Sequence, residues 1–417
     1  MDNAVRGSGR GLSFLVLATM FIGYAVYAID RTVLSAVLPL ISSALGLNNT
    51  ELGLLVAAQY IGVLAVVYFA GSISDRYGRL PIILAGLAVF SLFTWAIGFS
   101  SNFEEAFAFR LVSGLGEGLF WPVAMASVAS FFGQRKGFAL GVFYVGFDVG
   151  SAAGPALAGL TLTLTSDWRY AFFVAPLFGV VPIVMALLQR GRSGVLDQNV
   201  ERLSLGREAL LLARERNVAL TMVFALLATW ASVWQVAFLP YYFNKVLHYS
   251  VVYSAYLAAI VPVSGAVGKL TLGRASDSFA RPRVLAAVSG IVVVSYLAFF
   301  SLSALDLVVL AAIVMTFFSS SVFPIMQALM ADSCHGRVGA ALGLNTTSQS
   351  VATVFSTFIA GSLFSLGIGR VLAADATIPA VLMAFVALLL KEPRSGPATL
   401  TAGPKVRRLW VLAPRED

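Results

Sequence analysis

The chain has 417 residues, of which 59% are apolar and only 12% are charged. Soluble domains carry about 25% charged residues, so this composition predicts a membrane protein. The formal net charge of +8 would suit a nucleic-acid-binding protein, but the basic residues lie in short segments between apolar runs, which excludes that function.

Twelve apolar runs follow one another along the chain, and each is long enough to cross a bilayer, which takes about 20 residues of helix. They cover residues 13–41, 51–73, 80–100, 103–132, 138–164, 168–189, 217–244, 250–273, 283–303, 306–331, 338–366 and 371–390. Backbone polar groups in lipid must be bonded within their own segment, so each run is predicted to be a helix. The first run exceeds the apolar stretch of about 7–15 residues in a signal peptide, and we expect it to be retained.

The longest loop, 190–216, is charged and is predicted to be a cytoplasmic linker. It would join an amino-terminal six-helix bundle (1–189) to a carboxy-terminal one (217–391), and a cytoplasmic tail (392–417) would follow. The sequence therefore predicts an all-α membrane protein with twelve transmembrane helices in two bundles.

The two halves repeat each other at an offset of 202 residues. Asp75 and Asp277 are separated by this distance, and RKGFALG at 135–141 returns as RVGAALG at 337–343. Six helices bring the chain back to its starting side, so the repeated halves are parallel. Parallel halves with a site between them are a known transporter plan.

Basic residues predict the orientation, because Lys and Arg concentrate in cytoplasmic loops. With the amino terminus inside, 23 of the 28 bases face the cytoplasm, including Lys269 at an expected helix end, and three face outward. Arg31 and Arg110 lie within helices. We therefore expect both termini in the cytoplasm. We also expect the protein to lie in a cell inner membrane, with anionic headgroups around its loops, and to be a monomer.

The segment GSISDRYGRL joins the second and third predicted helices and resembles the signature loop of the major facilitator superfamily. The resemblance extends over essentially the whole chain and implies the fold of that superfamily. In this loop it rests on Gly71, Asp75, Arg76, Gly78 and Arg79.

A weaker copy, GRASDSFAR at 273–281, retains Asp277 and Arg281. We expect both loops to act as conformational latches. Asp75 would cap or pair with a nearby helix end, while the arginines of its loop face anionic headgroups. The alternative is that these basic loops only fix the orientation of the chain.

Ionisable residues within membrane spans are costly and are functional by default. The predicted helices place Asp30 and Arg31 on the first, Arg110 and Glu117 on the fourth, and Asp148 on the fifth. At about 1.5 Å per residue, Asp30, Arg31 and Arg110 reach the same depth, and Glu117 lies roughly 10 Å closer to the cytoplasm. An acid on helix one and a base on helix four can therefore neutralise each other.

These charges resemble those of the anion:cation symporter family, in which sugar-acid and organic-anion proton symporters occur. The resemblance implies that Arg31 contacts a substrate carboxylate, that Asp30 and Glu117 take part in proton coupling, and that Arg110 modulates the pair. Spinster-type lipid transporters are similar at the same positions. The residue chemistry agrees, because arginine forms a fork suited to carboxylates and a buried glutamate without a fixed partner takes up a proton readily.

Other roles stay open for these charges. The four on helices one and four could form a static cluster that holds the two helices together. Asp148 could be a second proton-coupling site or a hydrogen-bond partner of a neighbouring helix. Further substrate-binding candidates are polar or aromatic, and each could equally serve helix packing. They are Tyr27, Gln59, Tyr60, Tyr144, Trp234, Gln235, Asn345 and Gln349.

The sequence therefore predicts a secondary active transporter that carries a small organic anion, a carboxylate or a sugar acid, together with protons by alternating access. A Spinster-like lysolipid transporter and a proton-coupled antiporter or exporter are the alternatives. An enzyme is not expected, because the apolar runs contain neither a nucleophile–base pair nor a metal-binding cluster. We expect no cofactor and no metal.

Overall fold

The computed structural model describes residues 2–132, 136–189, 214–276, 278–334 and 338–392, and these residues form helices without any strand. The first half contains α1 (Asp2–Ala44), α2 (Asn49–Tyr77), α3 (Arg79–Ile97), α4 (Phe103–Phe132), α5 (Lys136–Thr165), α6 (Arg169–Val174) and α7 (Leu177–Leu187). The second half contains α9 (Arg216–Lys245), α10 (Val251–Ala275), α11 (Arg281–Ser301), α12 (Leu305–Ser333), α13 (Val338–Ser362), the 3₁₀ turn η3 (Phe364–Leu366) and α14 (Ile368–Leu389).

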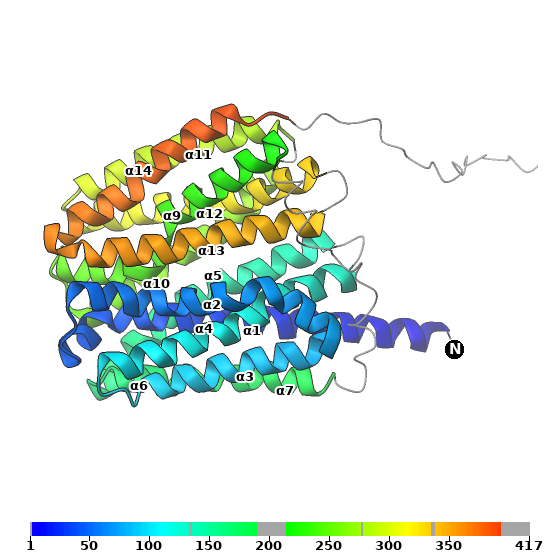
Figure 1. Ribbon diagram of the computed structural model, residues 1–417, viewed down its shortest axis with the longest axis horizontal. Helices are drawn as coiled ribbons and strands as arrows, with labels where there is room; N and C mark the ends of the chain where they lie inside the picture. The colour runs from blue at the N-terminus through cyan, green and yellow to red at the C-terminus, as the bar shows by residue number, and fades with distance from the viewer. Residues whose placement is uncertain (1, 133–135, 190–213, 277, 335–337, 393–417) are drawn as a thin grey trace, which may run out of the picture.

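Eleven segments of the described chain are long and apolar enough to cross a membrane, and they coincide with eleven of the twelve predicted runs. The remaining run forms α13, which lies in the same bundle (Figure 1) but is richer in polar side chains. Several of its hydroxyl groups donate to the carbonyl one turn earlier, as Thr353 Oγ1 does to Gln349 O at 2.9 Å. The helix thereby satisfies many of its own hydroxyl groups.

The sixth predicted helix is interrupted rather than continuous. Residues 168–189 form α6 and α7, with Pro176 at the amino-terminal cap of α7. Proline has no backbone N–H, and its ring clashes with the preceding turn. The apolar composition hid this break, because both pieces together still have the length of one span.

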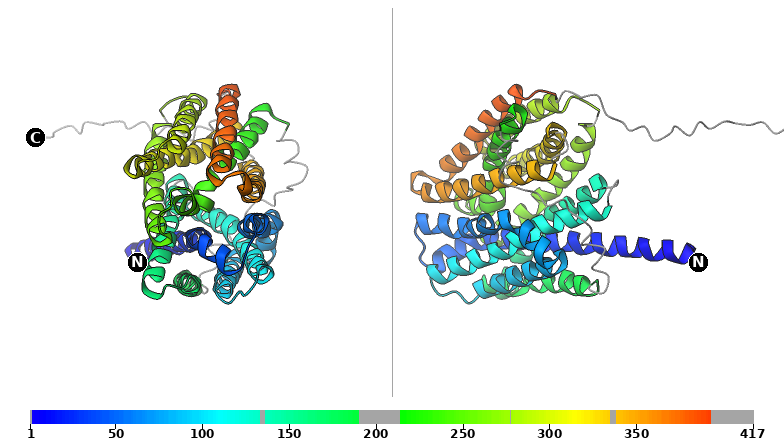
Figure 2. Two further views of the ribbon diagram at one scale, coloured as in Figure 1. Left: turned by 90° about the vertical axis from the view of Figure 1, so that its left-hand side faces the viewer. Right: turned by 45° about the vertical axis from the view of Figure 1, so that its right-hand side comes forward.

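The two halves lie against each other, with α9–α14 above α1–α7 in Figure 1 and in the end-on view of Figure 2. The most extensive packing between them joins α2 to α13 and α5 to α10. We call the end where α7 stops and α9 starts the linker end, and the opposite end the far end. Loops 45–48 and 246–250 lie at the far end.

The halves are in direct contact near the far end. Gly53, in the first turns of α2, meets Gly361, in the last turn of α13, so closely that a side chain on either would overlap the other backbone. Gly159 of α5 packs in the same way against the ring of Tyr256 on α10. Small residues thus let the two halves close tightly at this end.

Glycines also bring α2 and α4 together inside the first half. A side chain at Gly62 would overlap the carbonyl oxygen of Leu111, and one at Gly114 would overlap that of Gln59. The two backbones therefore approach each other closely. This contact sets the position of Gln59 relative to Glu117, one turn beyond Gly114.

Candidate functional site

A cavity of about 690 Å³ lies between the two halves. It extends toward the linker end, where Ala129, Gly141 and Ala331 line it within a few residues of their helix ends. Its walls are largely apolar and aromatic, with a few polar and charged side chains. This volume and lining are those of a site for a small molecule.

Asp30 of α1 lies at the centre of a buried network. Its carboxylate accepts hydrogen bonds from Thr94 Oγ1 at 2.5 Å, Ser113 Oγ at 2.7 Å, Gln59 Nε2 at 2.8 Å and Arg110 Nη1 at 3.3 Å. These four donors match the lone-pair capacity of a carboxylate. The structure thus pairs Asp30 with Arg110, in agreement with the depths counted from the sequence.

Glu117 of α4 is fully buried and paired with Arg31 of α1. Its Oε2 accepts from Arg31 Nε at 2.9 Å and Nη2 at 2.8 Å, and its Oε1 accepts from Gln59 Nε2 at 2.7 Å. The expectation that Glu117 lacks a fixed partner is wrong. The partner lies on another helix, 86 positions away in the sequence.

Arg31 is held between two aromatic rings as well as by Glu117. Its guanidinium carbon lies 4.2 Å from the ring centroid of Tyr27 and 4.6 Å from that of Tyr60. Cation–π contacts of this kind stabilise a positive charge that is partly removed from water. The Arg31 side chain remains 12% exposed and lines the cavity.

Gln59 of α2 joins the two ion pairs. Its Nε2 donates to both carboxylates, and its Oε1 accepts a short hydrogen bond from Arg110 Nη2. Two acids and two arginines are therefore held as one network without net charge. Of these four charged residues only Arg31 borders the cavity, so a ligand would meet Arg31 with Glu117 behind it.

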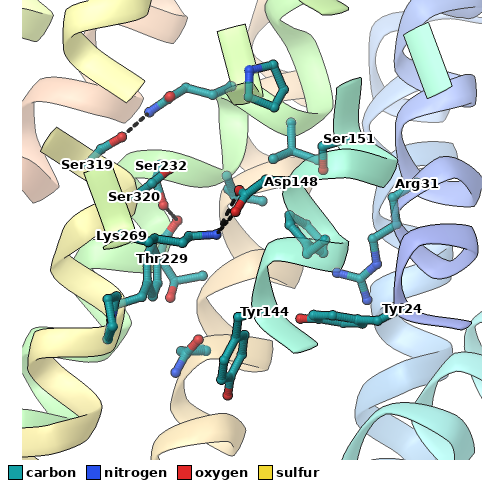
Figure 3. A pocket seen from close by; sticks show the side chains of 18 of the residues that line it. Tyr24, Arg31, Tyr144, Asp148, Ser151, Thr229, Ser232, Lys269, Ser319 and Ser320 are labelled. Carbon is teal, nitrogen blue, oxygen red and sulfur yellow. Dashed lines mark hydrogen bonds and ion pairs between the residues drawn. The ribbon is translucent and has the colours of Figure 1, made fainter. Parts of the chain in front are cut away.

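A second ion pair crosses the cavity from one half to the other. Lys269 Nζ of α10 lies 2.8 Å from Oδ1 and 2.9 Å from Oδ2 of Asp148 on α5 (Figure 3). The prediction that Lys269 belongs to a cytoplasmic helix end does not hold for its side chain. That side chain lines the cavity, because the long aliphatic stem carries the charge along the helix surface.

The remaining substrate-binding candidates divide into two groups. Five of them line the cavity: Tyr27, Tyr60, Tyr144, Gln235 and Gln349. Tyr144 also donates a hydrogen bond to Gln327 Oε1 across the two halves at 3.1 Å. Gln235 is bonded to Tyr296, Thr316 and Ser319, so it forms part of a neutral polar wall on the second half.

Trp234 and Asn345 do not line the cavity. Trp234 is fully buried among aromatic rings of α11, with centroid distances of 5.0 Å to Phe300 and 5.5 Å to Phe299. Asn345 is 1% exposed and is not among the residues that line the cavity. Residues one position away, Gln235 and Thr346, face it instead. The polar or aromatic character of a residue does not predict which face of its helix the side chain occupies.

The loop between α2 and α3 agrees only in part with the latch prediction, because Arg79 is buried in the protein rather than facing lipid headgroups. Gly78 separates the helices with φ of 88°, a conformation that favours glycine. Arg79 is buried and donates from Nη1 to Ala126 O at 3.4 Å, whereas Arg76 lies over the ring of Tyr77. Asp75 is exposed and forms no ion pair with any described residue.

The other latch residues give less information. Gly71 is exposed and has no side chain packed over it among the described residues. Arg281 pairs with Asp332 at the end of α12. Asp277 lies outside the described residues. The latch hypothesis therefore stays a prediction.

One membrane acid was missed from the sequence. Asp375 of α14 accepts from Trp230 Nε1 at 2.7 Å and from Ser356 Oγ at 2.9 Å. It lies in the last predicted run, where an acid was visible but was not counted. Together with Lys269, it places ionisable side chains within the helices of the second half as well.

A sequence profile of the Major Facilitator Superfamily matches residues 20–305 and, in a second overlapping match, residues 237–415. Among solved structures, the crystal structure of a D-xylose-proton symporter superposes with a TM-score of 0.74 at 15% identity, covering 91% of this chain and 98% of that one. This similarity extends to the fold of both halves.

Two relatives illustrate the range of similar sequences. Protein spinster of Drosophila melanogaster is 28% identical over 218 residues, which is 51% of this chain but only 36% of the length of that relative. The 3-(3-hydroxy-phenyl)propionate transporter of Escherichia coli is 24% identical over 374 residues, covering 85% of this chain and 88% of the relative.

Proposed function

Because this chain belongs to the Major Facilitator Superfamily, and is thus a transporter rather than an enzyme, we propose that it carries a small organic anion together with a proton. The observation that carries this proposal is the Arg31–Glu117 pair. Arg31 borders the cavity, and its neutralising acid lies fully buried behind it.

The coupling follows from the charge balance. With Glu117 ionised, Arg31 is neutralised and has little attraction for an anion. When Glu117 takes up a proton, Arg31 is left with an unbalanced positive charge and can bind a carboxylate through its planar fork. Loss of the proton returns Arg31 to Glu117 and releases the anion. One proton then accompanies each carboxylate.

Asp30 has a different role in this scheme. Its four donors hold it with Arg110 and Gln59, away from the cavity. We infer that Asp30 and Arg110 fix the position of Gln59, which in turn orients Glu117. This assigns the mobile proton to Glu117 and narrows the sequence hypothesis, which allowed either acid.

Alternating access is supported by the asymmetric closure of the halves. They meet tightly at the far end through Gly53 and Gly361, while the cavity extends toward the linker end. Since the basic loops predict that the linker end is cytoplasmic, this conformation corresponds to an inward-facing carrier. The opposite state would separate α2 from α13 at the far end.

A lysolipid is a second candidate substrate. The largely apolar walls of the cavity would accept an acyl chain, and protein spinster is among the similar sequences. A carboxylate is favoured because the relative that is covered over most of its length is a transporter of 3-(3-hydroxy-phenyl)propionate, and because Arg31 offers one fork-shaped site beside a cavity of small-molecule size.

The test is uptake into liposomes that contain the purified protein, driven by a pH gradient. Aromatic carboxylates, sugar acids, dicarboxylates and lysolipids would be compared. We expect accumulation of a carboxylate that Arg31→Gln abolishes. Glu117→Gln should abolish accumulation against a gradient while retaining exchange of substrate across the membrane. Full proton-driven accumulation in Glu117→Gln would refute the assignment, and accumulation of lysolipids alone would favour the second candidate.

A further inference from the structure

We propose that the Asp148–Lys269 pair is the second half of the substrate site and that it binds a hydroxyl group. The substrate would then be a hydroxylated carboxylic acid whose hydroxyl lies at the opposite end from its carboxylate. This inference rests on the proposed function, because it assumes that Arg31 takes the carboxylate. It assigns a role to the ion pair of the cavity wall that the coupling scheme leaves unused.

The two charged sites border the same cavity and are connected by aromatic rings. Arg31 lies over Tyr27, the centroids of Tyr27 and Phe147 are 6.3 Å apart, and Lys269 Nζ is 5.7 Å from the centroid of Phe147. In the view of Figure 3, Asp148 lies between Lys269 and Arg31. A flat apolar body could lie along these rings with one polar end at each site.

Hydrogen-bonding capacity favours a hydroxyl at the second site. The bonds from Lys269 to Asp148 use two of the three ammonium donors and one acceptor position on each carboxylate oxygen. A hydroxyl can accept the third donor and donate to a free lone pair of Asp148. It therefore binds without separating the ion pair.

A second carboxylate fits this site poorly. It could reach Lys269 only by approaching Asp148, a like charge, or by displacing it. Breaking a buried ion pair leaves an unpaired charge and is strongly unfavourable. An ammonium group meets the same difficulty at Lys269. A neutral group that is both donor and acceptor avoids both costs.

Ser151 provides an independent indication of a ligand. It lies three residues after Asp148 on α5, on the same face of the helix, and it lines the cavity beside Asp148 (Figure 3). The side chain is 3% exposed, and its Oγ has no hydrogen-bond partner among the described residues. Buried hydroxyls are normally bonded, so a polar ligand group at this position would complete it.

The experiment measures equilibrium binding to the purified full-length protein at acidic pH. Under the proposed scheme, Glu117 is then protonated and Arg31 is available to a carboxylate. The probes are phenylpropionate and benzoate, each unsubstituted, ring-hydroxylated or ring-carboxylated. In at least one of the two series, the phenylpropionates or the benzoates, we expect the hydroxylated acid to bind more tightly than the unsubstituted one. The expected gain in affinity is about tenfold to a hundredfold, which is the contribution of a hydrogen bond to a charged group. The double variant Asp148→Ala with Lys269→Ala should reduce this ratio toward one.

A single substitution reverses the preference. Asp148→Asn leaves Lys269 without its acid, so the ring-carboxylated probe should gain affinity relative to the hydroxylated one. The matched control is Asp167→Asn with Arg169→Gln, which removes an exposed ion pair of 4.0 Å at the far end. This control should keep the wild-type ratio.

The outcomes separate this inference from the proposed function. If carboxylates bind in an Arg31-dependent manner but the hydroxyl gives no advantage, only the present inference is wrong. It is also wrong if the hydroxyl preference survives in the double variant, or if the wild-type protein binds the ring-carboxylated probe most tightly. If none of the carboxylates binds, the proposed function fails as well.

Discussion

Replacing Glu117 by glutamine should uncouple anion binding from proton uptake. In the proposed mechanism, Glu117 neutralises Arg31, so tight binding of an anion requires that Glu117 also take up a proton. Glutamine has a similar shape and no charge. It leaves Arg31 available at every pH, so the affinity of Glu117→Gln for the anion should become nearly independent of pH.

The magnitude follows from linkage. If binding takes up one proton, the Kd of the wild-type protein rises tenfold per pH unit above the pH at which empty Glu117 loses its proton, or about 1.4 kcal/mol per unit. At alkaline pH the anion must also replace the two Arg31–Glu117 hydrogen bonds of 2.9 Å and 2.8 Å. Such bonds contribute about 1.5–3 kcal/mol each. Glutamine keeps part of this hydrogen-bond energy with Arg31. At alkaline pH the Glu117→Gln variant should therefore bind the anion at least about tenfold more tightly than the wild-type protein.

The assay is isothermal titration calorimetry in buffers of different ionisation enthalpy, which counts the protons taken up on binding. We expect one proton for wild type and none for Glu117→Gln. The matched control is Glu104→Gln, the same change at an exposed position in the first turn of the same helix. It should behave as wild type.

Two results would contradict this mechanism. Uptake of one proton by Glu117→Gln would show that another group carries it, and Asp30→Asn would then be the next variant to measure. Weaker binding of the anion by Glu117→Gln than by wild type at alkaline pH would show that Glu117 assists the anion rather than competing with it.

Three further predictions concern the whole carrier. Transport of a monoanion with one proton moves no net charge, so an imposed potassium diffusion potential should not change its rate, whereas an uncompensated charge would experience about 2.3 kcal/mol per 100 mV. Gly114→Val should lower stability by about 1–3 kcal/mol through overlap with Gln59, seen as a lower thermal unfolding midpoint, while the control Gly290→Val has no neighbour to overlap among the described residues. Asp75→Asn should slow turnover without weakening substrate binding if its loop is a latch, and normal turnover would remove that hypothesis.

Much of the fold could be predicted because lipid imposes a simple rule. Every span needs a long apolar run with internal backbone bonding, so eleven of the twelve runs recur as candidate spans. The exceptions have local causes. Pro176 interrupts the sixth helix without changing its composition, and α13 tolerates many hydroxyls because they bond to its own backbone.

The site was less accessible to sequence analysis. Depth along a helix is a count of residues, and this count correctly brought Asp30 to Arg110. The same count separated Glu117 from Arg31, although the arginine side chain reaches it at 2.8 Å. The direction in which a side chain points around its helix, and its partners on other helices, are set by packing. These two features determine which of the remaining candidates line the cavity. Lys269 lies six residues before the end of α10 and was placed by its helix position alone, although its long side chain reaches Asp148, 121 positions away.

Charge balance also explains how the proposed coupling could be strict. An empty carrier with Glu117 ionised has paired charges throughout, and a carrier loaded with both proton and anion is again balanced. A proton alone would leave Arg31 unpaired, and an anion alone would place two negative charges around one arginine. Either state would have to cross the closed conformation with a buried unpaired charge, which costs several kcal/mol. In the proposed mechanism the balanced states would therefore interconvert between the two sides and the unbalanced ones would be slow, so neither proton nor anion would leak without the other.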